Sequence, residues 1–274
     1  MAHPQIAAFA RMAGENSKPN RLIAGQETRL SRTMHDVRYD AVHDEMFVTN
    51  PFSRAILVFR GGADGEEAPI RIIQGPNTRL RGADRLDVDP VHNEIYIPNG
   101  RDILVFPREG RGDIAPTRVI TGPDLTSDDV GTLAVDPINN VFVTAKDVVR
   151  TASTQRSRLL IYDRTANGES RPLRIIAGPK TEILRINQLQ VYPPTGRIIA
   201  AMPGAYDMQE PEGVFIGIWN ITDNGDVPPR WKIAGPRSTM MKPRGVAINP
   251  KDKEILVGDM RMNAVLTYYL PEIF

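Results

Sequence analysis

The sequence predicts an all-β chain built from one repeated unit, and three observations support this prediction. An aromatic residue is followed ten positions later by a proline and six positions after that by a glycine, in five copies with unchanged spacing. An isoleucine lies two residues before each of these glycines. Short runs of Val, Ile, Leu and aromatic residues alternate with Asp-Pro, Asn-Gly and Gly-Pro turns, a pattern typical of strands. The five copies are Phe9-Pro19-Gly25, Phe59-Pro69-Gly75, Phe106-Pro116-Gly122, Tyr162-Pro172-Gly178 and Trp219-Pro229-Gly235.

The second copy shows how one unit is built. Residues 85–89, 95–98, 103–106 and 118–121 predict four successive strands, with a turn at 90–94 and a Gly/Pro-rich connection at 110–116. In most copies the first hairpin turns at an Asp or Asn followed by Pro, whose side chain and fixed φ favour a turn. Such a four-stranded antiparallel unit, repeated at intervals of 47 to 57 residues, predicts a β-propeller whose blades surround a central channel.

Five blades are predicted, with six as the alternative. The sequence contains five first hairpins, six third strands and five fourth strands, beginning with a third and a fourth strand and ending with a third strand at 265–269. We therefore expect the strand near 22–24 to pair with the C-terminal blade, since this closure would remove open sheet edges. The repeats predict a single propeller domain over residues 1–274.

One strand entry resembles a known repeat family. The segment at 240–250, MMKPRGVAINP, is similar to the entry strand of NHL-repeat propellers. The resemblance extends over nearly the whole chain, although Asp36, Arg85, Thr132 and Gln188 stand where the best copy has Gly245. It implies a propeller fold, and six blades are frequent in that family. The activity is left open, because one fold hosts many functions.

Composition excludes several classes of function. The 34 Lys and Arg residues nearly balance the 33 Asp and Glu residues, so the net charge of +1 creates no overall field toward nucleic acid or an anionic membrane. There is no cysteine, which excludes disulfides and thiolate metal sites. No run reaches 18 apolar residues, and the first 30 residues lack a signal-peptide core. We expect a soluble protein without membrane insertion; its compartment stays open, an exported mature domain included.

The candidate site lies where the first strand of each blade begins. The connections between blades and those between second and third strands share one face of a propeller, and loops on a rigid scaffold often carry function. Positions five and four residues before each hairpin Asp or its equivalent carry a different polar group in nearly every blade, whereas structural positions repeat. We expect a partner protein or a small ligand to bind there without catalysis or a cofactor. The candidate residues are His35, Asp36, Asp84, Arg85, Asn187, Gln188 and Arg244.

An alternative function is a calcium-assisted hydrolase or lyase, such as a lactonase, with its site at the central channel. Hard cations prefer carboxylate and amide oxygens, which Asp84, Asn187, Asn50 and Asn99 would supply. His35 is the proton-transfer candidate. The resemblance to propeller lactonases is incomplete, because no glutamate falls on these positions.

Other repeated residues are predicted to be structural. The five aromatics occupy one position in every copy, which indicates core packing. Arginines two residues after the prolines, at 21, 71, 118 and 174, fall on outer strands. His43 and His92 belong to hairpin turns. Insertions at 145–158 and 202–213 extend the candidate face, with charges that would let them pair with each other.

Overall fold

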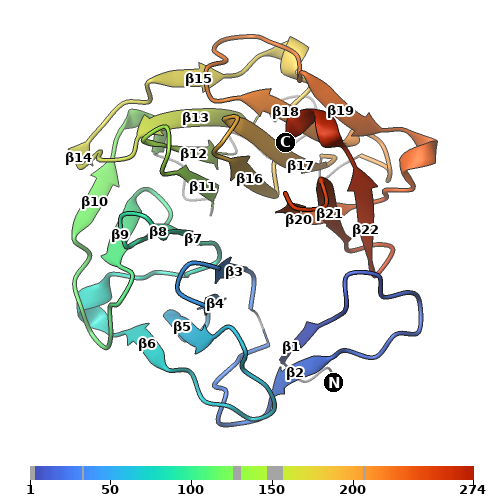
Figure 1. The fold of residues 1–274 in the computed structure, drawn as a ribbon. Helices are drawn as coiled ribbons and strands as arrows, with labels where there is room; N and C mark the ends of the chain where they lie inside the picture. Colours follow the sequence, from blue (N-terminus) through green and yellow to red (C-terminus); the bar gives the residue numbers. More distant parts are fainter. Residues whose placement is uncertain (1–3, 33, 126–130, 147–156, 206–207) are drawn as a thin grey trace. The chain divides into compact units, whose positions relative to one another are not determined.

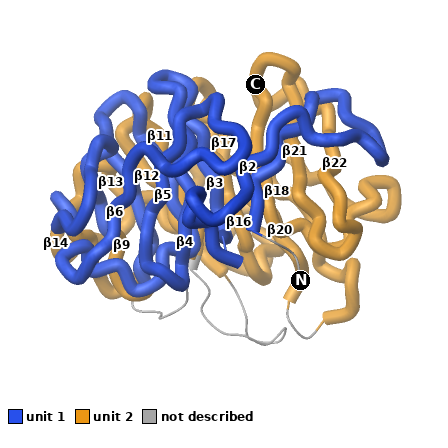
Figure 2. The backbone as a smooth tube through the Cα atoms, turned by 90° about the horizontal axis from the view of Figure 1, so that it is seen from below, with its two compact units in different colours: residues 1–99, 104–118 blue, residues 100–103, 119–274 orange. Residues whose placement is uncertain are grey.

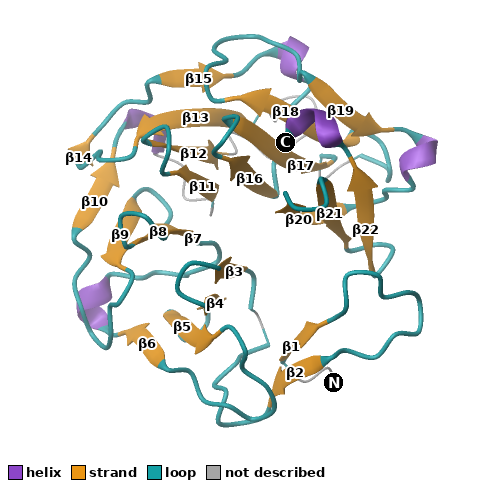
Figure 3. Cartoon of the chain, in the orientation of Figure 1, coloured by secondary structure: helices purple, strands orange, loops and turns teal. Residues whose placement is uncertain are grey.

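The chain is all-β, as predicted, and helix in the described residues is limited to single turns. The computed structural model describes residues 4–32, 34–125, 131–146, 157–205 and 208–274 (Figure 1). Within these ranges there are 22 strands and five 3₁₀ turns (Figure 3). In the described residues no helix has the length and apolar character needed to cross a membrane.

The strands form a short hairpin and five blade sheets. The hairpin pairs β1 (Gln5–Ala8) with β2 (Arg21–Ala24). The first blade contains β3 (Val37–Asp40), β4 (Glu45–Asn50), β5 (Ala55–Arg60) and β6 (Arg71–Gln74), and the second contains β7 (Asp87–Asp89), β8 (Glu94–Pro98), β9 (Ile103–Pro107) and β10 (Arg118–Thr121). The third contains β11 (Thr132–Asp136), β12 (Val141–Lys146), β13 (Arg158–Asp163) and β15 (Arg174–Ile176), and the fourth contains β16 (Gln188–Tyr192), β17 (Arg197–Pro203), β18 (Val214–Asn220) and β19 (Trp231–Ala234). The fifth contains β20 (Pro243–Asn249), β21 (Glu254–Asp259) and β22 (Ala264–Tyr269). The two-residue β14 (Gly168–Glu169) joins the edge of β10 in parallel.

Five blades are confirmed, each starting at a predicted first hairpin. Four of the described blades carry all four strands in simple antiparallel order, and the last has the order β20-β21-β22. The strand β22 pairs with β21, and β2 pairs with β1. Closure of the propeller by pairing the N-terminal and C-terminal strands stays a prediction.

The chain divides into two compact units (Figure 2). Unit 1 contains residues 1–99 and 104–118, and unit 2 contains residues 100–103 and 119–274. The single domain over 1–274 stays a prediction, and each unit is described by itself below.

The repeated isoleucine joins each sheet to the next by pairing with a second glycine, which lies in a turn of the following repeat. Ile23 pairs in parallel with Gly65, and Ile73 pairs in the same way with Gly112. In unit 2 the pairs are Ile120 with Gly168 and Ile176 with Gly225. These second glycines have φ between 63° and 79°, a left-handed conformation that glycine adopts without steric cost. The isoleucine recurs because it forms this backbone pairing with the next repeat.

The repeat glycines accommodate a side chain or a carbonyl from the following repeat. A Cβ atom on Gly75 would lie 2.4 Å from Oδ1 of Asp113, which accepts a 2.7 Å hydrogen bond from the Asn77 amide. Gly178 and Asp226 repeat this arrangement in unit 2, with Lys180 as the donor. The Arg-Gly-Asp tripeptide at 111–113 is thus part of the scaffold.

Sheets pack face to face within each unit. In unit 1, Ile23 of the hairpin packs with Val48 and Leu57 of the first blade. In unit 2, one apolar cluster joins the blades β11–β15 and β16–β19, and a second joins β16–β19 to β20–β22. This packing is the arrangement of propeller blades.

The predicted core aromatics are confirmed in four copies and wrong in one. Phe59, Phe106, Tyr162 and Trp219 are fully buried, whereas Phe9 is 53% exposed. Phe9 directly follows β1, which belongs to a sheet of only two strands, so it lacks the inner strands that cover its counterparts.

The outer-strand arginines are structural, as predicted. Arg71 binds Glu45 through both terminal nitrogens, and Arg118 donates to Glu94 and to the hydroxyl of Tyr96. The remaining two donate to backbone carbonyls: Arg21 to Gly61 and Ala63, and Arg174 to Ile221.

Candidate functional site

In unit 1 the structure brings His35, Asp84 and Arg85 together. Nδ1 of His35 lies 2.9 Å from Oδ1 of Asp84, and the two side chains are 45% and 26% exposed. Arg85 donates to the carbonyl of His35 at 2.6 Å and to that of Asp84 at 3.3 Å. The connections that lead into β3 and β7 therefore lie side by side, and the imidazole of His35 is accessible to solvent.

Asp36 belongs to the same group of predicted residues, but its carboxylate points into the protein. It accepts hydrogen bonds from the amides of Val37 (3.1 Å) and Leu86 (3.2 Å) and lies 3.6 Å from Arg38. Burial raises the pKa of Asp36 above its ordinary value, against the opposing effects of Arg38 and Arg85. Asp36 therefore connects the start of β3 with the start of β7, the first strands of the first two blades. Its position in the sequence did not reveal this role.

In unit 2 the structure brings together the starts of two first strands, one carrying Asn187 and Gln188 and the other carrying Arg244. Oε1 of Gln188 accepts a 2.8 Å hydrogen bond from the amide of Val246, which places the start of β16 beside the start of β20. A Cβ atom on Gly245 would lie 3.2 Å from that same oxygen, so glycine gives the amide group room. Asn187 is fixed by its backbone N–H, which donates to the carbonyl of Ala201 at 3.0 Å.

Arg244 is half-buried, and it differs from other arginines of the described residues whose Nε atom is buried. Its Nε is buried without a hydrogen-bond partner, a property that it shares with Arg71, Arg158, Arg185 and Arg197. Arg71 and Arg158 bind carboxylates through their terminal nitrogens, and Arg197 lies 4.6 Å from the centre of the Trp231 ring. Arg244 has no such ion pair or ring contact with a described residue. The guanidinium of Arg244 is therefore a cation at the start of β20 without an ion pair to a described residue.

Asn50 and Asn99, two of the residues proposed as calcium ligands, are buried. Each forms hydrogen bonds with the segment that leads into the first strand of its own blade. The amide nitrogen of Asn50 donates to the carbonyl of Arg29 at 2.9 Å, and its oxygen accepts from the hydroxyl of Ser31. Asn99 binds the carbonyl of Arg79 and the amide of Arg81 in the same way. Within the described ranges no three His, Asp or Glu side chains form a group suited to a metal ion. The calcium site stays a prediction.

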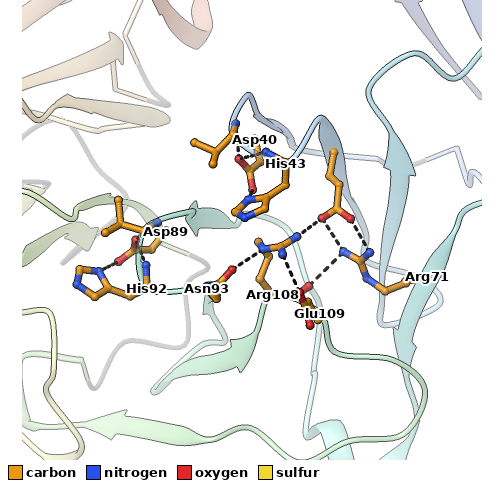
Figure 4. A network of polar contacts seen from close by, with 11 residues as sticks. Asp40, His43, Arg71, Asp89, His92, Asn93, Arg108 and Glu109 are labelled. Carbon is orange, nitrogen blue, oxygen red and sulfur yellow. Dashed lines mark hydrogen bonds and ion pairs between the residues drawn. The ribbon is translucent and has the colours of Figure 1, made fainter.

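The histidines of the hairpin turns are structural, as predicted. Nδ1 of His43 lies 2.7 Å from Oδ2 of Asp40, whose Oδ1 accepts from two turn amides. His92 and Asp89 repeat this arrangement (Figure 4). Each carboxylate thereby closes a turn.

The described part of the second insertion binds the fifth blade. Glu210 accepts hydrogen bonds from Lys242 and from Arg261, and these two contacts hold the pKa of its carboxyl below the ordinary value. Lys242 lies two residues before Arg244, so this ion-pair cluster borders the candidate residue. At the end of the first insertion, Arg158 pairs with Asp124 at 3.3 Å. Residues 147–156 and 206–207, which carry further charges of the insertions, lie outside the described residues.

Comparison with known proteins supports the fold. No family model matches the sequence, and no curated protein sequence matches it. Among solved structures, a chain of hydrazine synthase from Kuenenia stuttgartiensis matches with a TM-score of 0.56 and 11% identity, covering 90% of this chain and 58% of that chain. The fold is a β-propeller. This chain spans a little over half of the matched chain, and the likeness at this identity concerns the fold alone.

Proposed function

We propose that the chain is an NHL-like, non-enzymatic binding module whose ligand, a partner protein or a small molecule, presents an acidic group to Arg244. The observation that supports this is the half-buried guanidinium without a partner at the start of β20. A buried polar group without a hydrogen bond costs about 1 to 3 kcal/mol, and natural proteins retain few of them. A carboxylate or phosphate would provide the missing bonds, which are strongest when both partners are charged.

The neighbours of Arg244 suit such a ligand. Glu210, the carboxylate nearest in the described part of the second insertion, is already bound to Lys242 and Arg261. Gln188 holds the two loop ends in place through Val246. An acidic group arriving at Arg244 would therefore meet a fixed backbone and a cation that has no competing partner.

Replacement of Arg244 tests whether its side chain serves binding or stability. We expect Arg244→Met to raise the free energy of unfolding by about 1 kcal/mol, because it keeps the apolar stem and removes the uncompensated buried Nε. Urea denaturation of both proteins measures this difference. Arg197→Met is the matched control and should be destabilised, since Arg197 stacks on Trp231. A clear loss of stability in Arg244→Met would show that the arginine is structural.

Ligand binding is tested with acidic probes. Citrate and a decaglutamate peptide should each raise the Tm of the native chain if Arg244 takes an acidic group, because binding to the folded state alone stabilises it. The rise should disappear in Arg244→Gln and persist in Arg237→Gln, which changes an exposed arginine seven residues earlier. Equal responses of the two variants would reject Arg244 as the binding residue.

A second candidate function is favoured by the contact of His35 with Asp84. A carboxylate on Nδ1 orients an imidazole so that Nε2 can accept a proton, and Nε2 of His35 has no partner among the described residues. This geometry suits the calcium-assisted hydrolase or lyase, in which Asp84 would also be a cation ligand.

Calcium distinguishes the two functions. We expect neither calcium nor EDTA to change the Tm of the metal-free protein, because the side-chain oxygens of Asn50 and Asn99 already accept hydrogen bonds. Thermal unfolding with each addition, together with elemental analysis of the purified protein, checks this. A calcium-specific rise in Tm that is lost in Asp84→Ala would instead support the enzyme and justify a screen of lactones and esters.

A further inference from the structure

Unit 1 contains a groove lined by arginines, none of which belongs to the predicted binding or calcium-ligand residues. It has a volume of about 550 Å³, and its lining includes Ser53, Arg54, Gln74, Arg79, Leu80 and Arg81. These residues come from the turn between β4 and β5 and from the connection that leaves β6 through η1 (Pro76–Thr78). Three cationic side chains thus line one groove, and no carboxylate of the described residues does.

The walls of the groove are fixed by side chains from neighbouring strands. The amide of Asn99 donates to the carbonyl of Arg79 at 3.3 Å and accepts from the backbone N–H of Arg81 at 2.8 Å. On the other wall, Gln74 donates to the carbonyl of Ser53 at 2.8 Å. A ligand would therefore meet a backbone that needs no rearrangement, which lowers the entropic cost of binding.

The fold does not require arginine at these positions. Arg54 and Arg79 have φ values of 51° and 61°, a left-handed conformation in which most side chains are disfavoured by about 1 kcal/mol. The equivalent of Arg54 in the last blade is Asn263, at φ 50°. At the positions equivalent to Arg79 and Arg81, later repeats carry other residues, whereas the glycine before η1 is kept in each. The replacements are Glu182 and Thr239 for Arg79, and Leu184 and Met241 for Arg81.

We propose that this groove binds the phosphate group of a small phosphorylated molecule. A guanidinium presents a planar pair of N–H donors that matches two phosphate oxygens, and several such groups around one anion add charge and direction. The side chain of Arg54 is exposed and makes no hydrogen bond or ion pair with a described residue, so it is available to the ligand. The size of the groove lies within the range of pockets that enclose small organic molecules. This proposal is independent of the binding function assigned to Arg244.

Calorimetric titration of the full chain with pyrophosphate tests the proposal. We expect saturable binding that weakens about tenfold in Arg54→Gln and in Arg81→Gln, since each variant loses a charge-assisted hydrogen bond. Arg29→Gln is the matched control, because Arg29 takes the place of Arg79 in the preceding repeat and has φ 56°. Its affinity should stay within about twofold of the wild type, in keeping with the small effects of surface changes far from a site.

Three results would overturn the proposal. The first is the absence of saturable heat at millimolar pyrophosphate, and the second is an equal loss of affinity in Arg29→Gln. The third is equal displacement of pyrophosphate by chloride and by inorganic phosphate at matched ionic strength, which would indicate general charge screening. Circular dichroism and Tm of each variant, if unchanged, ensure that a lost affinity reflects the groove and not the fold.

Discussion

Glu45→Gln is expected to lower the free energy of unfolding by about 3 kcal/mol at pH 7, because it breaks a buried ion cluster and leaves charge without a partner. Glu45 is 8% exposed and receives both terminal nitrogens of Arg71, at 2.6 and 2.7 Å, and one nitrogen of Arg108, at 2.5 Å. Arg108 also binds Asn93 and Glu109, and this network ties the first blade to the second (Figure 4). Urea denaturation measures the loss.

The pH dependence of this loss follows from the pKa of Glu45. The hydrogen bonds from Arg71, and the charge of Arg108, hold the pKa of Glu45 below its ordinary value against the effect of burial. A lowered pKa in the folded state stabilises the protein above the ordinary value of about 4.3, and the stabilisation disappears as pH falls through the folded pKa. The difference between the wild type and Glu45→Gln should therefore begin to shrink below about pH 5.

An exposed ion pair is the control for this cluster. Glu67 pairs with Arg60, whose side chain is 54% exposed, and exposed pairs contribute little to stability. Glu67→Gln should leave the free energy of unfolding nearly unchanged from pH 7 to pH 3.5. Equal effects of the two substitutions would show that burial does not decide the strength of the Glu45 cluster.

The fold was predictable from the sequence because each blade repeats the same local signals. The hairpin at Asp40 and the hairpin at Asp89 form as predicted, since a carboxylate two residues before a turn amide closes the turn by itself. The order of the strands was predictable because the strands of each blade pair antiparallel in the order of the sequence. Burial of Phe9 was wrongly predicted, because position in the repeat does not tell whether the strands that cover a residue are present.

The candidate site was predictable only in its location within the blade. Sequence position predicted that neighbouring first strands begin side by side, and within the units the contact of His35 with Asp84 and the hydrogen bond of Gln188 with Val246 agree with this. It did not show that Asp36 is buried against Leu86, nor that Arg244 lacks a partner. Both depend on the direction of a side chain, which spacing along the chain does not encode. The arginine groove was missed because its three arginines do not recur through the blades: Arg79 has an arginine equivalent in Arg29, whereas later repeats carry Glu182 and Thr239 at that position.

Gly122→Ala is expected to destabilise the protein by about 3 kcal/mol, at the upper end of the cost of inserting a methyl group into a packed site. A Cβ atom at this position would lie 2.1 Å from the backbone carbonyl oxygen of Ser170, and a backbone atom cannot move aside as a flexible side chain can. The amide of Ser170 donates to the carbonyl of Thr121 at 2.8 Å beside the parallel pairing of β10 and β14. The methyl group would therefore push apart the contact that joins one repeat to the next.

Gly168→Ala isolates this steric effect from the effect of backbone conformation. Gly168 lies in β14, opposite Ile120, with φ 65° and no heavy atom within 4 Å of an added Cβ. Alanine there should cost only about 1 kcal/mol, the penalty of a left-handed conformation. Urea denaturation of the two variants separates the two effects. A loss of similar size in both variants would mean that Gly122 is needed for its backbone conformation alone. The close approach of neighbouring repeats would then not explain why the glycine recurs at the same spacing in all five copies.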